Sequence, residues 1–277
     1  QLTSDLQAQS NEKVPLFIGI DEEGGDVVRM AEKLTPPPSQ KEIGATGDIE
    51  QAKTWAIKTA KSLKDMGINV NFAPVADVGS NDKRSYSTDT NTVIDFVRAA
   101  TKGYQQENII YSLKHFPGIG KGRVDSHVDS SSIDVAKEVL MTEDIIPFKT
   151  IIDENDPNDY FILVSHLKYP ALDEEYPASL SSKIMTDLLR NELGYKGIII
   201  TDDMEMGAVA NHNDFRSIGV KAVKAGADIV LVCHEYEHQQ EVYLGLLDAV
   251  NSGEISQERI DESVKRIIKV KLLHLYQ

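Results

Sequence analysis

Short apolar runs alternate along the chain with amphipathic segments, and most of the apolar runs end in polar residues. Six runs have the composition of buried strands: 14–23, 68–77, 108–115, 160–166, 197–203 and 227–235. Their apolarity is continuous rather than alternating, which is typical of strands covered on both faces in a parallel sheet. Five further segments carry helical periodicity: 49–67, 91–106, 181–194, 214–227 and 256–276.

These repeated strand–helix units predict an α/β fold, and we expect a (β/α)8 barrel of the TIM type. Such a barrel gathers its active site at the carboxyl ends of its strands, where polar residues recur in this chain. A short extra strand is expected near 128–133 and another before Gln1, so the barrel is predicted to be incomplete at its N-terminal strand. An open doubly wound sheet is the alternative, but its glycine-rich phosphate turn is missing. Residues 1–277 contain no linker and are predicted to form a single domain.

Composition narrows the classes of partner. Lys and Arg total 29 against 44 Asp and Glu, a net charge of −15, which argues against nucleic acid or an anionic membrane as a partner. The single cysteine, Cys233, excludes an internal disulfide and a cysteine-based zinc site. No apolar run approaches the roughly 20 residues of a membrane span. We expect a monomer, either cytoplasmic or exported to the cell-wall side, since a preceding strand or export signal is expected before Gln1.

Polar residues follow nearly every predicted strand and are the candidates for a functional site. They are Asp21, Asp77, Lys114, His115, His166, Asp202 and Asp203, with Asp125 and His127 on the loop after the third strand. Each one alone is equally consistent with a helix cap or a solvated loop residue. In a barrel they converge on one mouth, which predicts a site for a polar ligand.

Two of these groups suggest specific chemistry. Residues two apart in an extended loop point the same way, so Asp125 can hold one imidazole nitrogen of His127 and make it a proton shuttle. An Asx turn with an exposed histidine is the structural alternative. Asp202 suits a nucleophile, a metal ligand or a helix cap. Asp21 with Arg29 suits recognition of hydroxyls, although a turn with a surface arginine explains this pair nearly as well.

Eight motifs together resemble glycoside hydrolase family 3, in order and over almost the whole chain. They are IDEEGGDVVR, NFAPVADV, KRSYS, KHFPGIG, DSH, SHLKYPALD, PASLS and GIIITDDMEMGAV. The most similar branch is that of the bacterial β-N-acetylglucosaminidases. The resemblance implies a retaining exo-glycosidase that removes terminal β-linked N-acetylglucosamine from peptidoglycan- or chitin-derived saccharides. It implies neither a cofactor nor a metal.

The resemblance also implies roles for individual residues. Asp202 matches the nucleophile that forms a covalent glycosyl-enzyme, and His127, held by Asp125, matches the acid/base of this branch. The positions that bind the sugar hydroxyls and the N-acetyl region are matched by Asp21, Arg29, Arg84, Lys114 and His115. His166 lies in the SH motif and is a weaker candidate for the substrate site.

Three residues depart from the family pattern: Ile119, Lys121 and Asp26. None has an expected catalytic role, but they can alter loop mobility and with it aglycone preference or rate. The alternatives are a phosphorylase, since a neutral imidazole repels phosphate less than a carboxylate does, and a catalytically decayed sugar-binding barrel. Two further rivals are a metal-dependent barrel hydrolase and a substrate-assisted hexosaminidase that uses Asp202 and Asp203 as its acid pair.

Overall fold

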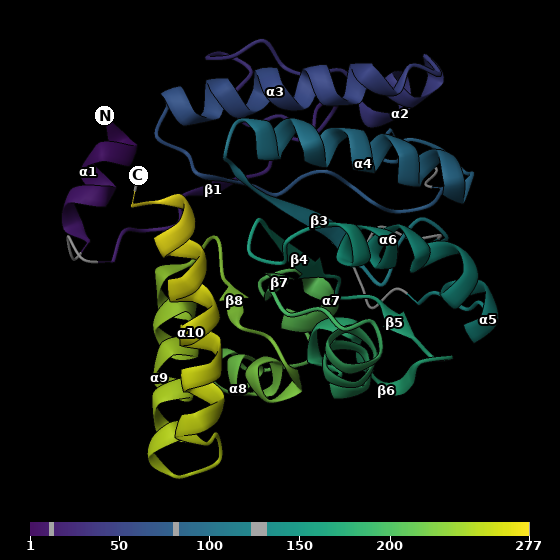
Figure 1. Ribbon diagram of the computed structural model, residues 1–277. Helices are drawn as coiled ribbons and strands as arrows, with labels where there is room; N and C mark the ends of the chain where they lie inside the picture. Colours follow the sequence, from purple (N-terminus) through teal and green to yellow (C-terminus); the bar gives the residue numbers. More distant parts are fainter. Residues whose placement is uncertain (11–13, 80–82, 123–131, 277) are drawn as a thin grey trace.

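The computed structural model describes residues 1–10, 14–79, 83–122 and 132–276 (Figure 1). Within these residues the main sheet has six parallel strands, and each of the six predicted runs overlaps one of them. The strands are β1 Gly19–Ile20, β2 Val70–Asn71, β3 Ile110–Phe116, β4 Tyr160–Val164, β7 Ile198–Asp203 and β8 Ile229–Leu231. A separate antiparallel hairpin consists of β5 Lys168–Tyr169 and β6 Asp173–Pro177.

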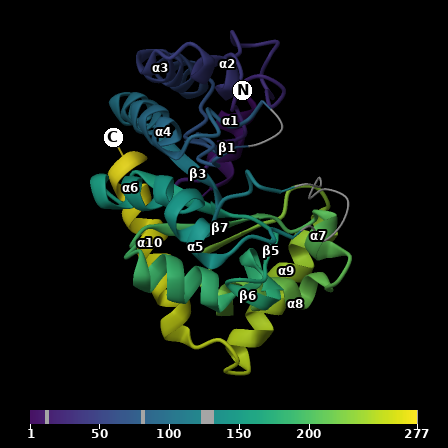
Figure 2. The same ribbon diagram turned by 90° about the vertical axis from the view of Figure 1, so that its right-hand side faces the viewer.

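Helices surround the curled sheet, as Figures 1 and 2 show. The α-helices are α1 Leu2–Gln9, α2 Gln40–Ala45, α3 Ile49–Asp65, α4 Thr90–Gln106, α5 Lys137–Val139, α6 Ile146–Glu154, α7 Gly207–Ala210, α8 Phe215–Ala225, α9 Tyr236–Asn251 and α10 Gln257–His274. Two π-helical segments, η1 Leu140–Asp144 and η3 Lys183–Glu192, and one 3₁₀ turn, η2 Ala178–Leu180, complete the elements. The five predicted helices correspond to α3, α4, η3, α8 and α10. Among the described residues, no helix is both long and apolar enough to span a membrane.

The strand order agrees with a barrel-like winding. Within the described ranges the order is β1-β2-β3-β4-β7-β8, which follows the chain without a reversal. A doubly wound sheet reverses its order at a switch point. The α/β prediction is therefore confirmed as a curled parallel half-barrel, and closure into eight strands stays a prediction. Of the expected strand near 128–133, only residues 132 and 133 are described, and Ser132 pairs with Lys168 of the hairpin instead of the main sheet.

Both faces of the sheet are buried, which explains the continuous apolar runs. Along β4, Tyr160 and Ile162 enter one apolar cluster, while Phe161 and Leu163 enter another that includes Val270 of α10. Successive strand side chains point to opposite faces, so each face needs its own apolar cover. The helices supply that cover, and the polar residues are left at the strand ends.

Candidate active site

The carboxyl ends of the parallel strands bring several predicted site residues to one edge of the sheet. These residues are Asp21 after β1, Asp77 after β2, Lys114 and His115 in β3, His166 after β4 and Asp202 in β7. Direct contacts join neighbouring strand ends: Lys114 Nζ lies 2.6 Å from Asp21 Oδ1, and His115 Nδ1 lies 2.9 Å from Asp77 Oδ2. The structure thus gathers the residues, while their catalytic and binding roles stay predictions.

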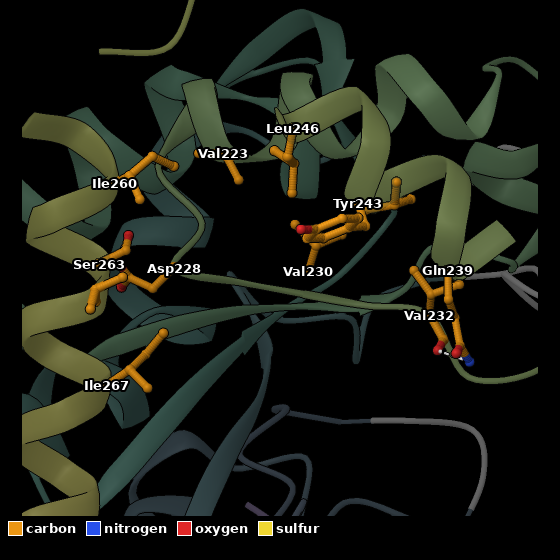
Figure 3. A pocket seen from close by; sticks show the side chains of 12 residues that line it. Val223, Asp228, Val230, Val232, Gln239, Tyr243, Leu246, Ile260, Ser263 and Ile267 are labelled. Carbon is orange, nitrogen blue, oxygen red and sulfur yellow. Dashed lines mark hydrogen bonds between the residues drawn. The ribbon is translucent and has the colours of Figure 1, made fainter. Parts of the chain in front are cut away.

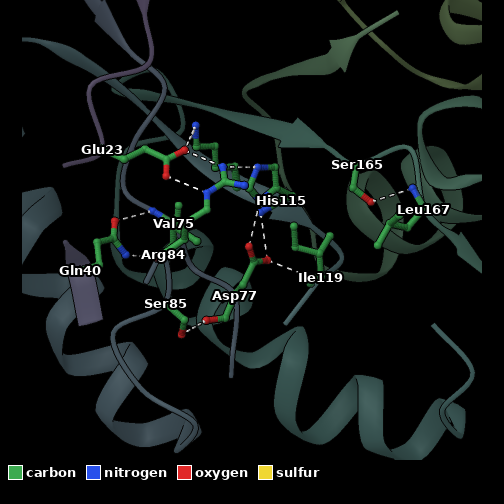
Figure 4. Close-up of polar contacts among 12 residues, drawn as sticks. Glu23, Gln40, Val75, Asp77, Arg84, Ser85, His115, Ile119, Ser165 and Leu167 are labelled. Atoms are coloured by element: carbon green, nitrogen blue, oxygen red, sulfur yellow. Dashed lines mark hydrogen bonds and ion pairs between the residues drawn. The ribbon is translucent and has the colours of Figure 1, made fainter. Parts of the chain in front are cut away.

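A buried carboxylate, Glu23, links the two cations of this edge (Figure 4). Its Oε1 lies 2.5 Å from Lys114 Nζ and 2.6 Å from an Arg84 guanidinium nitrogen, and its Oε2 accepts a second bond from Arg84 Nε at 2.9 Å. The Lys114 and Glu23 side chains are each only 2% exposed, whereas Asp21 is 40% exposed. Ser85 Oγ donates to the carbonyl of Asp77, which ties the Arg84 segment to the end of β2.

The charges in this network stabilise one another. Burial by itself raises the pKa of the Glu23 carboxyl, but Lys114 and Arg84 outweigh it and lower the pKa to about 2. Burial lowers the pKa of the Lys114 ammonium, and Glu23 and Asp21 raise it above its ordinary value. Both groups are therefore charged near neutral pH. Asp21, with its partly exposed carboxylate, is the acidic member of the network that a ligand can reach.

The low pKa of Glu23 makes part of the stability of the fold depend on pH. A carboxyl whose pKa falls from 4.5 to about 2 on folding stabilises the protein above pH 4.5, and this stabilisation is lost as the pH falls through about 2. We expect Glu23→Gln to lower the free energy of unfolding at pH 7, and the difference from the parent to shrink below pH 4.5. Urea denaturation at several pH values measures this. A difference that does not change with pH would contradict it.

His115 is fixed in one tautomer by its two partners. Arg84 has only donors, so the His115 Nε2 atom, 3.1 Å from its guanidinium, is the acceptor. Nδ1 therefore carries the proton and donates to Asp77 Oδ2. Asp77 Oδ1 accepts from the backbone amides of His115 and Ile119. Asp77, itself 2% exposed, thus holds the ring, the backbone of His115 and the start of the following turn.

Asp202 lies next to the last residue of β7, beside this cationic edge. Burial raises the pKa of its carboxyl, but the nearby imidazoles of His166 and His115, the amide of Asp203 and the charge of the Lys114 ammonium together lower it below its ordinary value. Its Oδ1 accepts the amide of Asp203 at 2.9 Å. Thr201 Oγ1 accepts the amide of Leu231, which joins the end of β7 to β8. Asp202 is consequently an ionised, partly buried carboxylate on a strand held at both sides.

The neighbouring carboxylate, Asp203, has structural partners. Its Oδ1 accepts the amides of Cys233 and Glu205, at 3.1 and 3.2 Å, and its Oδ2 lies 3.2 Å from His234 Nε2. It therefore ties the turn after β7 to the end of β8. The two adjacent aspartates have different surroundings, because Asp202 lies near the Lys114 ammonium and the His115 ring, whereas Asp203 is held by the turn after β7 and the end of β8.

His166 is buried beneath the end of β7. Its Nε2 lies 2.8 Å from the carbonyl of Asp203, so this nitrogen donates, and Nδ1 accepts from the Ser179 hydroxyl at 2.6 Å. Burial lowers the pKa of the imidazole despite the nearby Asp202 carboxylate. Both ring nitrogens are engaged within the protein, which is the arrangement of a group that supports the end of β7. Substrate contact by His166 stays a prediction.

The turn after β1 contains both a second buried acid and Arg29. Glu22 Oε2 accepts the backbone amides of Arg29 and Met30, at 2.9 and 3.1 Å. Burial raises the pKa of Glu22, with these two amides and the Arg29 charge acting in the opposite direction. The Arg29 residue is exposed, and nearby Asp26 forms an exposed ion pair with Lys83.

Asp125 and His127 lie outside the described residues, so the predicted acid/base pair is not tested by the structure. The residues that precede them are described. Ile119 donates its amide to Asp77, and Lys121 pairs with Asp144 of η1. Ile119 and Lys121 therefore lie between His115 and the predicted acid/base segment.

A cavity of about 320 Å³ opens elsewhere, between β8, α8, α9 and α10 (Figure 3). Its lining is mostly apolar. Asp228, which also lines it, forms ion pairs with Arg190 at 2.7 Å and with Arg266 at 2.8 Å. None of the predicted site residues lines it. A pocket without converging polar groups is a poor candidate for a sugar site, so we place the site at the strand ends.

Sequence reasoning did not single out Glu22 or Glu23. An acidic triplet such as DEE usually lies in solvent, because Glu is rarely fully buried unless it is paired. The signal that identifies Glu23 is its spacing: residues 21 and 23 fall on the same side of an extended strand end, so both reach Lys114.

The position of Lys114 argues against the alternative of a metal-dependent hydrolase. Its ammonium lies between the two carboxylates, and the described ranges contain no cluster of three or more metal-ligating side chains.

Comparison with known proteins places the chain in a family. The family model for the glycosyl hydrolase family 3 N-terminal domain matches residues 1–270. β-Hexosaminidase A of Pseudoalteromonas piscicida is 35% identical, over 98% of this chain and 50% of the relative. β-Hexosaminidase of Nitrosomonas eutropha is 30% identical, over 95% of this chain and 78% of the relative.

A solved structure gives the same assignment. The family 3 β-N-acetylglucosaminidase of Paenibacillus sp. str. FPU-7 superimposes with a TM-score of 0.93 at 38% identity, covering 98% of this chain and 53% of the other. The chain thus spans about half the length of this structure and of the Pseudoalteromonas enzyme. The strand-end site, the family model and the structural match agree: the chain belongs to glycoside hydrolase family 3.

Proposed function

We propose that this chain is the catalytic domain of a retaining exo-glycosidase that releases terminal β-linked N-acetylglucosamine. The observation that carries the proposal is the ionised carboxylate of Asp202, which lies on the same strand-end edge as the Asp21–Lys114–Glu23–Arg84 network and His115. Retaining glycosidases need such a carboxylate at the anomeric carbon, with hydrogen-bonding groups that hold the sugar hydroxyls. The printed names of the relatives support N-acetylglucosamine as the sugar.

The proposed reaction proceeds in two displacements. Asp202 attacks C1 as the glycosidic C1–O bond breaks, and the leaving oxygen takes a proton from His127, which Asp125 orients. Water then gives a proton to His127 and attacks C1, which releases the sugar and frees Asp202. In the substrate complex, Asp21 and Arg84 are proposed to hold hydroxyls and the N-acetyl group, while Lys114 and His115 keep these groups in place and the Lys114 charge favours the ionised form of Asp202. Arg29 is proposed to join them from the exposed turn.

The structure bears on the substrate-assisted alternative. That mechanism needs Asp203 beside the substrate, but the Asp203 carboxylate is occupied by two backbone amides and His234. Trapping with a fluorinated N-acetylglucosaminide, followed by mass spectrometry, separates the two mechanisms. Covalent sugar on Asp202 supports the proposed reaction, and fast turnover without any trapped species contradicts it.

A panel of p-nitrophenyl glycosides tests the activity itself. We expect the β-N-acetylglucosaminide to be hydrolysed at least about 100-fold more efficiently than the β-glucoside, because a site built to hydrogen-bond a substrate group rejects analogues that lack it. The same assay in phosphate and in a non-nucleophilic buffer tests the phosphorylase alternative, which predicts a sugar phosphate product. Equal turnover of both sugars, or equally slow turnover by the parent and Asp202→Ala, would contradict a glycosidase for N-acetylglucosamine.

A further inference from the structure

The turn 117–122 connects the site residue His115 to the segment that contains the predicted acid/base pair. Its first half is fixed from three sides. Gly118 donates its amide to the carbonyl of His115 at 2.7 Å, Ile119 donates to Asp77 Oδ1 at 2.9 Å, and Tyr169 donates its hydroxyl to the carbonyl of Gly118 at 2.9 Å. The path of the chain through residues 118 and 119 is therefore set by groups that also hold His115.

The second half of the turn is fixed by an ion pair with η1. Lys121 Nζ lies 2.6 Å from Asp144 Oδ2 and 3.0 Å from Glu143 Oε2. The Asp144 side chain is fully buried, while that of Lys121 is 25% exposed. The η1 segment packs closely against the turn, since a Cβ added to Gly118 would lie 2.8 Å from the Asp144 Cβ. The buried Asp144 carboxylate thus contacts the turn through an ion pair with the Lys121 ammonium.

Two features distinguish this contact from an ordinary surface ion pair. The Asp144 Oδ1 atom is buried and has no hydrogen-bond partner among the described residues, so the Lys121 contact at Oδ2 is the main compensation for its burial. Lys121 also meets a second carboxylate, since Glu143 Oε2 lies 3.0 Å from the same ammonium. The pair therefore joins the turn to η1 through a buried charge.

We propose that Lys121 and Asp144 are positioning residues, whose ion pair sets the direction in which the chain leaves the turn toward Asp125 and His127. The inference rests on the proposed function, since it concerns the geometry of the proposed proton donor. A change at this contact is expected to act on the chemical step more than on sugar binding, because the groups proposed to hold the sugar, Asp21 and Arg84, contact Lys114 and Glu23 instead of Lys121 or Asp144. Displacement of a reacting group by about 1 Å costs on the order of 100-fold in rate.

The contact is expected to depend on pH. Burial raises the pKa of the Asp144 carboxyl to about 6, with Lys121 acting in the opposite direction and Asp77 and Glu143 adding to the rise. Tyr169 also faces this carboxyl. Above about pH 6 Asp144 is ionised and the ion pair is complete, whereas below it the carboxyl takes a proton and the pair is lost. The positioning effect should therefore be present at pH 7 and absent at pH 5.

Substitutions of Lys121 and Asp144, assayed with the aryl N-acetylglucosaminide, test the inference. We expect Lys121→Met to lower kcat on the order of 10- to 100-fold with KM within about twofold of the parent. Lys121→Arg, which keeps the charge, should recover most of kcat. The ratio of parent to Asp144→Asn kcat should fall toward 1 as the pH drops through about 6. The double variant Lys121→Met/Asp144→Asn removes both charges of the ion pair and should lose no more activity than either single variant.

The outcomes separate this inference from the proposed function. A parent that does not hydrolyse the substrate would overturn the proposed function and this inference together. An active parent with an unchanged Lys121→Met kcat would overturn this inference alone. A parent-to-variant ratio that is constant with pH, with kcat tracking the loss of thermal stability, would show a purely structural pair and would also overturn it.

Discussion

Replacing Asp202 by Asn is expected to lower kcat/KM for an aryl β-N-acetylglucosaminide by at least about 10³-fold, because the amide cannot form the glycosyl ester. The nearby imidazoles, the Asp203 amide and the Lys114 charge lower the pKa of this carboxyl, so it is ionised at neutral pH, and the substitution preserves its shape. The free energy of unfolding is therefore expected to change little, although kcat/KM falls strongly. Steady-state kinetics and urea denaturation of the same preparations measure both quantities.

Asp203→Asn is the matched control for this experiment, since it makes the same chemical change at the next residue. Asp203 accepts the amides of Cys233 and Glu205 and thereby joins two strand ends. We expect this variant to lose stability, by about 1–3 kcal/mol, while keeping far more activity than Asp202→Asn. Equal losses of activity in the two variants would show that the reaction needs both Asp202 and Asp203. This result would contradict the separate roles inferred from their contacts.

The second large effect is expected from Lys114→Met, which removes a buried cation from the Glu23 carboxylate. Removing one partner of a buried ion pair costs about 3–5 kcal/mol, because the other charge stays buried without compensation. Arg84 still contacts Glu23 through two nitrogens, so we expect a loss near the lower limit, about 3 kcal/mol. Chemical denaturation at pH 7 measures the change.

Two further variants show whether the buried charge is the cause. Lys114→Met combined with Glu23→Gln should recover part of the lost stability, since the second change removes the uncompensated carboxylate. Lys149→Met breaks an i,i+4 pair with Asp153 on the surface of α6, where both side chains are about half exposed, and should cost less than about 0.5 kcal/mol. A Lys114→Met loss as small as that of Lys149→Met would refute a stabilising role for the network.

The strands and the edge on which the site lies were predictable because both follow from local pattern. Continuous apolar runs identify strands buried on two faces, and parallel strands place their carboxyl ends at one edge. The pattern alone therefore places Asp21, Lys114, His115 and Asp202 at one edge of the sheet. Other elements carry weaker local signals. The β5–β6 hairpin includes the polar run DEEYP, and α9 exposes Tyr243, Leu244 and Leu247, so its apolar residues do not define one buried face.

The internal contacts of the site were not predictable in the same way, because they join residues remote in sequence. Glu23 meets Lys114 and Arg84 across more than 60 positions, and Lys121 meets Asp144 across 23. A carboxylate in a polar stretch reads as solvated until its burial and its partner are known. Distances between side chains decide whether such a group stabilises the fold, binds a ligand or shifts a neighbour's pKa.

By itself, the amino-acid sequence determined that this protein has an α/β fold with parallel strands, an acidic composition and family 3 motifs with Asp202 at a strand end. Those properties depend on periodicity and on short motifs, which can be recognised without knowledge of the packing. Only the tertiary structure decided that Asp202 and Asp203 have different surroundings and that Glu23 connects the two cations. It also decided that Lys121 reaches a buried acid. Burial and electrostatic interaction depend on distances in space, which the order of residues does not contain.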